Sequence, residues 1–146
     1  MELSGSNAIL TGASRGLGVY IADALALAGV NLALAARDQT GLDATADRVR
    51  TKGVKVATIP TDVGDEDSLR NLADQAEEQL GPIDILINNA GVEHYIDFHT
   101  ADTKLIEKIM RVNILGPQVL TRFVLPGMVE RKRGHIVNIA SVAGKT

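Results

Sequence analysis

Short apolar runs alternate with amphipathic segments along the whole chain. Runs at residues 7–11, 30–36, 54–59, 83–88 and 135–140 predict five buried strands. Between them, apolar positions recur at helical spacing, as in the stripe Leu69, Leu72, Ala73, Ala76 and Leu80. Three of the predicted helices end at a glycine, namely at Gly29, at Gly53 and at the Gly81-Pro82 pair. Strand–helix alternation at this spacing predicts an α/β fold with a doubly wound parallel sheet of the Rossmann type, whose ligands bind beyond the carboxyl ends of the strands.

The segment 103–130 predicts one long helix with more than one apolar face. One stripe contains Leu105, Ile109 and Val112, and another contains Ile106, Met110 and Ile114. Two interpretations remain open. The helix lies inside one large core, or one of its faces meets a partner subunit.

Composition narrows the class of protein. The chain has 146 residues, enough for one domain, with 45% apolar and 3% aromatic residues and no Trp, so Ala, Leu, Ile and Val must build the core. A net charge of -3 gives no long-range attraction to nucleic acid. The absence of cysteine excludes disulfides and thiolate metal sites. No signal peptide is evident. No membrane span is evident either, because Asp23, Gly29 and Asn31 interrupt the most apolar run. We therefore expect a cytoplasmic protein.

The strongest local signal is TGASRGLG, residues 11–18, between the first strand and the first helix. Gly12, Gly16 and Gly18 permit a tight turn and a close approach of the backbone to a pyrophosphate. The helix that begins near Gly16 would offer its N–H groups to that anion. A purely structural turn is the alternative, but the position in the first strand–turn–helix unit favours a dinucleotide site.

With this turn, three further motifs resemble the short-chain dehydrogenase/reductase family over the whole chain. Asp62-Val63 follows the third strand, Asn88-Asn89-Ala90-Gly91 follows the fourth, Asn113 lies in the long helix, and NIASVAG ends the fifth strand. The resemblance implies a nicotinamide-dependent oxidoreductase that acts on a small carbonyl or alcohol substrate. It also implies a homo-oligomer and a strand order of 3-2-1-4-5.

The resemblance also assigns roles to individual residues. The turn formed by Gly12, Ser14, Arg15, Gly16, Leu17 and Gly18 would hold the cofactor pyrophosphate. Asp62 would accept a hydrogen bond from the adenine amino group, and Val63 would pack on the ring. Asn89, Ala90 and Gly91 would line the adenosine ribose. Asn113 would hold a water in a proton relay, and Ser141 would bind the substrate oxygen. Asn89 as a turn cap and Asn113 as a helix-distorting residue are the structural alternatives.

Charge near the second strand favours NADP(H) over NAD(H). An acidic residue at the end of that strand would bind the ribose 2′-hydroxyl of NAD, but the position holds Ala36, followed by Arg37. Arg15, in the glycine turn, supplies a second guanidinium, and such groups suit phosphate oxygens. Asp38 could compete by pairing with Arg37.

Family members use a Tyr-x-x-x-Lys pair downstream of the serine as proton donor. Tyr20 is followed four residues later by Ala24, and Tyr95 by His99, so neither fits. We therefore expect residues 1–146 to be the NADP-binding Rossmann domain, an incomplete five-stranded portion truncated before the Tyr/Lys helix and inactive alone. A non-catalytic NADP-binding or interaction module is the alternative.

A further expectation concerns association. A fifth strand at the sheet edge and an uncovered long helix would drive self-association of the fragment, or hold the missing segment.

One acidic and histidine-rich loop could suggest a metal site. Glu93, His94, Asp97 and His99 fall within seven residues. They lack the helical i, i+4 histidine pair of hydrolytic zinc sites, so we interpret them as a solvated loop near the substrate entrance and expect no metal.

Overall fold

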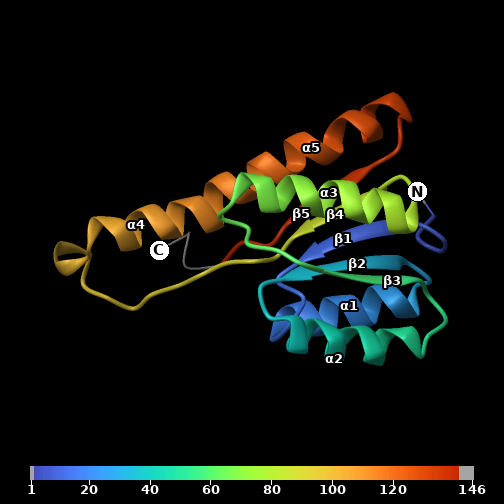
Figure 1. Ribbon diagram of the computed structural model, residues 1–146, viewed down its shortest axis with the longest axis horizontal. Coiled ribbons are helices and arrows are strands. Elements are labelled where there is room, and N and C mark those ends of the chain that lie inside the picture. The colour runs from blue at the N-terminus through green and yellow to red at the C-terminus, as the bar shows by residue number, and fades with distance from the viewer. Residues whose placement is uncertain (1, 142–146) are drawn as a thin grey trace.

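The computed structural model describes residues 2–141, which form a three-layer α/β arrangement (Figure 1). Five parallel strands lie in the order β3-β2-β1-β4-β5. Their bounds are β1 Asn7–Thr11, β2 Asn31–Ala36, β3 Val56–Pro60, β4 Ile85–Asn88 and β5 His135–Asn138. One face carries α1 (Leu17–Leu27) and α2 (Gln39–Arg50), and the other carries α3 (Glu66–Leu80) and α5 (Gly116–Glu130). The predicted fold class and strand order are confirmed.

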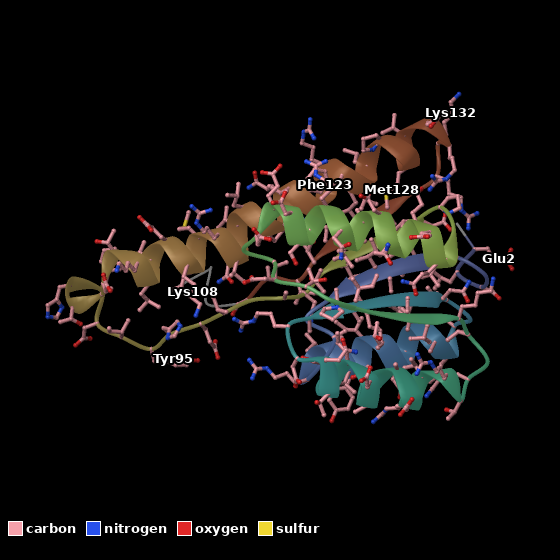
Figure 2. All side chains as sticks on the ribbon, viewed as in Figure 1. Glu2, Tyr95, Lys108, Phe123, Met128 and Lys132 are labelled. Atoms are coloured by element: carbon pink, nitrogen blue, oxygen red, sulfur yellow. The ribbon has the colours of Figure 1, made fainter. Side chains whose placement is uncertain are left out.

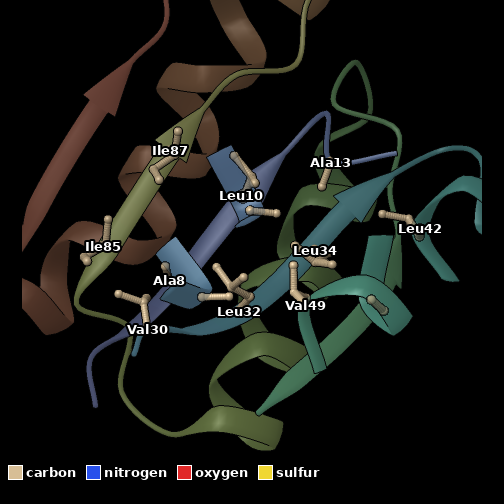
Figure 3. Close-up of a cluster of buried hydrophobic side chains, with 13 residues drawn as sticks. Ala8, Leu10, Ala13, Val30, Leu32, Leu34, Leu42, Val49, Ile85 and Ile87 are labelled. Carbon is tan, nitrogen blue, oxygen red and sulfur yellow. The ribbon is translucent and has the colours of Figure 1, made fainter. Parts of the chain in front are cut away.

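The sheet separates two apolar cores. Leu10, Leu32 and Leu34 point into the core beneath α1 and α2 (Figure 3). On the opposite face, Ile9 and Leu86 pack with residues of α3 and α5, among them Met128. Figure 2 shows Phe123 and Met128 on the side of α5 that faces α3. Because β1 is buried on both faces, its carboxyl end is held rigidly, and the glycine-rich turn follows directly from it.

β1 matches its predicted run, but β2 to β5 are shorter than theirs, in part because buried residues just outside a strand also pack in the core. Ile83 belongs to the core beneath α3 and α5, although β4 begins at Ile85. The run predicted to start at residue 54 enters the sheet only at Val56. Pro60 is the last residue of β3, a position that an edge strand tolerates. β5 ends at Asn138 and its residues are exposed or half-buried, so the interpretation of residues 135–140 as a buried strand is wrong. Its expected place at the edge of the sheet is confirmed.

The two ends of α3 lie at residues that are typical of helix ends. The carboxylate of Asp65 accepts a hydrogen bond from the Ser68 amide at 2.9 Å and so caps the start of α3, as expected of an aspartate at this position. That helix ends at Leu80, before Gly81 with φ 93°. Among residues 2–141, no helix combines the length and apolar character needed to cross a membrane.

The prediction of a single continuous helix over 103–130 is wrong, because the segment is interrupted. It consists of α4 (Thr103–Met110), a π-helical turn η2 (Arg111–Leu115) and α5. A π turn inserts one extra residue per turn, which changes the faces that follow it. No residue of α4 is buried, so α4 does not lie inside a core of this chain. The helix and the preceding loop, which contains the short helix η1 (Phe98–Thr100) and Tyr95, extend beyond the sheet (Figures 1 and 2).

Candidate functional site

The glycine-rich turn joins β1 to α1 in a geometry that only glycine provides. Gly12 and Gly16 have φ values of 69° and 56°, in the left-handed region. A Cβ atom at Gly18 would overlap the carbonyl oxygen of Gly12, so the missing side chain lets α1 start directly against the turn. Among residues 2–141, the amides of Ser14, Arg15 and Gly16 donate to no backbone or side-chain acceptor. The turn thus presents free donors at a helix start, which suits an anionic group.

Thr11 ties this turn to the end of β4. Its hydroxyl oxygen accepts hydrogen bonds from the amides of Asn89 and Ala90, both at 3.1 Å. The side-chain amide of Asn89 donates to the carbonyl oxygens of Thr11 and Gly12, at 3.0 and 3.2 Å. The structure therefore brings the residues predicted on two separate motifs together. The side chain of Asn89 stabilises the turn, which agrees with the structural alternative of a turn cap for this residue.

Two residues of α2 also support the turn, and the sequence motifs did not reveal them. The buried hydroxyl of Thr45 lies 2.9 Å from the carbonyl oxygen of Ala13. A Cβ at Gly41 would lie 2.8 Å from both Cβ and the carbonyl oxygen of Ser14, so glycine lets α2 pack against the turn. A threonine and a glycine inside an otherwise ordinary amphipathic helix were the only signal available.

Arg15 and Arg37, the proposed phosphate ligands, are exposed at the carboxyl side of β1 and β2. Within residues 2–141 neither arginine forms an ion pair. The competing pairing of Asp38 with Arg37 does not occur; the Asp38 carboxylate lies beside Gly41 instead. Both guanidinium groups are thus available to an anion.

The Asp62 loop (residues 62–65) follows β3 and is held by its own side chains. The Oδ1 atom of Asp62 accepts a hydrogen bond from the Gly64 amide at 2.9 Å, and the Asp62 amide donates to the hydroxyl of Ser68 at 2.9 Å. The side chain of Val63 packs against the core beneath α3 and α5. Asp62 is exposed, and among the described residues its Oδ2 atom accepts no hydrogen bond, so it remains available to an external donor such as an amino group.

Asn113 projects from the π turn toward the segment after β4. Its side chain accepts a hydrogen bond from the Val92 amide and donates one to the Val92 carbonyl oxygen, both at 2.8 Å. Gly91 also lies close, since a Cβ there would be 3.5 Å from the Asn113 Oδ1 atom. The predicted helix distortion at Asn113 is present, and its side chain positions the segment next to Asn89 and Ala90.

Ser141 lies just beyond β5 and is exposed. Two residues that begin motifs join the neighbouring strands, because the Asn88 side-chain amide donates to the Asn138 side-chain oxygen at 2.8 Å. These two asparagines are also partners in the sheet register. The last five residues of NIASVAGKT lie outside the described residues.

The residues of the acidic and histidine-rich loop do not converge. In the described part of the chain, no group of three or more His, Cys, Asp or Glu side chains could hold a metal ion. Tyr95 in this loop is 96% exposed.

The comparisons with known proteins agree with this geometry. The sequence pattern of the family described as short chain dehydrogenase matches residues 6–146. The ketoacyl reductase HetN of Nostoc sp. strain PCC 7120 is 48% identical over 143 residues, which are 98% of this chain and 50% of that protein. The chain thus spans about half the length of the curated relatives it matches.

Two solved structures share the fold. A metagenomic short-chain oxidoreductase in complex with NADP superposes with a TM-score of 0.94 and 36% identity, over 100% of this chain and 66% of that one. An NAD+-bound xylitol dehydrogenase superposes with a TM-score of 0.94 and 28% identity, over 100% and 56% of the two chains. The similar structures therefore include both nicotinamide cofactors.

Proposed function

The chain belongs to the short-chain dehydrogenase family of oxidoreductases, and from this premise we propose that residues 1–146 form the NADP(H)-binding domain of a carbonyl reductase or alcohol dehydrogenase. The observation that carries the proposal is the pair of exposed guanidinium groups of Arg15 and Arg37, which form no ion pair within residues 2–141 and lie beside a glycine turn whose amides have no acceptor there. Guanidinium groups bind phosphate oxygens through two parallel hydrogen bonds.

The residues present fit a dinucleotide. The positive φ values of Gly12 and Gly16 and the close start of α1 at Gly18 support this fit, because they give the turn a shape that lets a pyrophosphate approach the backbone. We assign Gly12, Ser14, Arg15, Gly16, Leu17 and Gly18 to the pyrophosphate, Arg37 with Arg15 to the 2′-phosphate, and Asp62 with Val63 to adenine. Asn89, Ala90 and Gly91 would line the ribose.

In the complete reaction, a bound nicotinamide would supply or accept the hydride. Ser141 would donate a hydrogen bond to the substrate oxygen, and Asn113 would keep the segment around Val92 in place and hold a water of the proton relay. The proton itself needs a donor with a pKa tuned toward neutrality. Residues 1–146 contain no Tyr-x-x-x-Lys pair, so we propose that this chain alone binds cofactor without reducing a carbonyl.

The alternative that we propose is a non-catalytic nucleotide-binding or interaction module. A reductase assay with NADPH and a panel of ketones, aldehydes and ketoacyl thioesters separates the two for the native protein. Turnover by a preparation whose mass equals that of the 146-residue chain would contradict the proposed role of the missing pair.

We also propose that the protein works as a homo-oligomer in the cytoplasm, on a small-molecule substrate and without nucleic acid. The apolar side chains that α4 and η2 expose support the oligomer. The net charge of -3 supports the exclusion of nucleic acid.

Cofactor preference is the direct test. We expect calorimetric titration to give tighter binding of NADPH than of NADH, and Arg37→Asp to reverse the order. Loss of a phosphate-paired arginine should cost about 1.5–3 kcal/mol of NADPH binding. Arg122→Asp is the matched control, because Arg122 is exposed on α5 and, within residues 2–141, makes no ion pair. Equal affinities of the unmutated protein for both cofactors would contradict the assignment.

A further inference from the structure

The π turn η2 contacts two parts of the candidate site that are far apart in sequence. On one side, Asn113 makes its two hydrogen bonds to the backbone of Val92. On another side, the turn packs against the Asp62 loop: a Cβ at Gly64 would lie 3.5 Å from the Cγ2 atom of Val112. One irregular turn of helix therefore touches the segment after β4 and the loop after β3.

Gly116 makes the contact with the Asp62 loop possible. Its amide donates to the carbonyl oxygen of Arg111, the bond to the fifth residue back that closes the π turn. A Cβ atom at Gly116 would overlap the carbonyl oxygen of Val63 and would lie 3.2 Å from the Val63 carbonyl carbon. The obstacle is backbone on both sides, since the same Cβ would lie 3.2 Å from the Arg111 oxygen. Any side chain at this position must therefore displace the loop or the turn.

The loop has little means to absorb such a displacement. The Asp62 amide is bonded to Ser68 on α3, the Gly64 amide to the Asp62 carboxylate, and the Val63 side chain is packed in the core. A shift of the Val63 carbonyl therefore moves the Asp62 carboxylate with it. A rigidly fixed carboxylate discriminates among bases better than a mobile one, because its hydrogen-bond geometry is set before binding.

We propose that the π turn, with Gly116 as its contact residue, is a positioning element that holds the Asp62 loop in register for the adenine of the cofactor. This inference rests on the proposed function, since it takes Asp62 as the acceptor for the adenine amino group. It adds that two residues outside the sequence motifs, Gly116 and Val112, determine the preference for adenine, because they fix the position of the Val63 backbone and thereby of Asp62.

The test compares NADPH with its hypoxanthine analogue, in which an oxygen replaces the 6-amino group of adenine. The unmutated protein should prefer NADPH. Gly116→Ala should weaken NADPH binding about tenfold and should change the affinity for the hypoxanthine analogue much less, so that the preference is lost. A merely structural weakening would lower both affinities equally.

Gly127→Ala is the matched control, because it adds the same methyl group to the same helix. There the nearest heavy atom is the end of the flexible Arg131 side chain, at 3.0 Å from the added Cβ. This variant should keep the preference for NADPH.

A second pair of variants avoids the backbone overlap, in case Gly116→Ala does not fold. Val112→Ala removes the side chain that faces Gly64, and Val124→Ala removes an equally buried valine of α5; the two are 9% and 8% exposed. Val112→Ala should reduce the preference for NADPH over the analogue, and Val124→Ala should leave it unchanged. Retention of the preference for NADPH in Val112→Ala, and in Gly116→Ala if that variant folds, would overturn this inference and leave the proposed function standing. If the unmutated protein binds neither nucleotide, the proposed function is overturned and this inference with it.

Discussion

At the scale of single residues, the side chain of Thr11 connects the end of β1 to the segment after β4. Its hydroxyl oxygen is the acceptor for two consecutive amides after β4, those of Asn89 and Ala90. An isosteric apolar residue would leave both donors without a partner in a largely buried place, and unmade bonds of this kind are costly.

We therefore expect Thr11→Val to lower the free energy of unfolding by about 1–3 kcal/mol in urea denaturation. Thr58→Val on β3 is the control, because its hydroxyl only accepts a long contact of 3.5 Å from Gln39. Its effect should stay within about 0.5 kcal/mol. Equal stability of Thr11→Val and the unmutated protein would show that the two amides find another acceptor.

Sequence motifs located most of these residues but not how they contact one another. The glycine turn, Asp62, Asn89 and Asn113 each carried a signal, because their chemistry depends on residue type at a fixed strand or helix end. Thr45, Gly41 and Gly116 carried only the weak signal of a threonine or a glycine inside a helix, since their roles depend on how closely α2 and α5 approach a backbone elsewhere in the chain.

At the scale of elements, α1 and α2 are held together at the surface by Asp23. Its carboxylate accepts two hydrogen bonds from Arg48, at 2.9 and 3.2 Å, and pairs with Lys52. These partners, Arg48 first, hold the pKa of the Asp23 carboxyl well below its ordinary value. The carboxyl has a pKa of about 3.9 in the unfolded chain. Because its pKa is lower in the folded state, the contact stabilises the protein fully above that pH and less as the pH falls below it.

Asp23→Asn should consequently lower the melting temperature at pH 6–7, and the difference from the unmutated protein should shrink as the pH falls below about 4. High salt should reduce it as well, because the group is partly exposed. Asp47→Asn removes a surface pair within one turn of α2 and should have a smaller effect. A difference that is independent of pH would show that Asp23 acts through packing and not through its charge.

The strands and the first three helices were predictable because hydrophobic period and turn residues fix them locally. The long helix was not, since a π turn leaves the sequence helical in character and only shifts which faces follow. Strand ends were also uncertain, because buried residues such as Ile83 pack in the core without belonging to the sheet.

At the scale of the whole molecule, α4 and η2 expose neighbouring apolar side chains. Met110, Ile114 and Leu115 are each about half exposed and line a hollow of about 400 Å³ with Glu107, Arg111 and Gln118. Soluble monomers rarely expose contiguous apolar patches of large area.

We expect light scattering to give a mass above that of the monomer, and the double variant Met110→Lys/Ile114→Lys to lower it. Leu27→Lys, at an apolar residue of α1 that is 73% exposed, should leave the mass unchanged. A monomeric mass of the unmutated protein at micromolar concentration would contradict self-association through this surface.

The central claim is that a dinucleotide binds at the carboxyl ends of β1, β2 and β4. The glycines test it directly, because Gly12, Gly16 and Gly18 lie at that end, whereas Gly53 and Gly81 precede β3 and β4 at the opposite end of the sheet. In an NMR titration with NADPH, the amide signals of Gly12, Gly16 and Gly18 should shift in a saturable way, and those of Gly53 and Gly81 should not. Saturable shifts confined to Gly53 and Gly81, or no shift at the glycine turn, would contradict the proposed site.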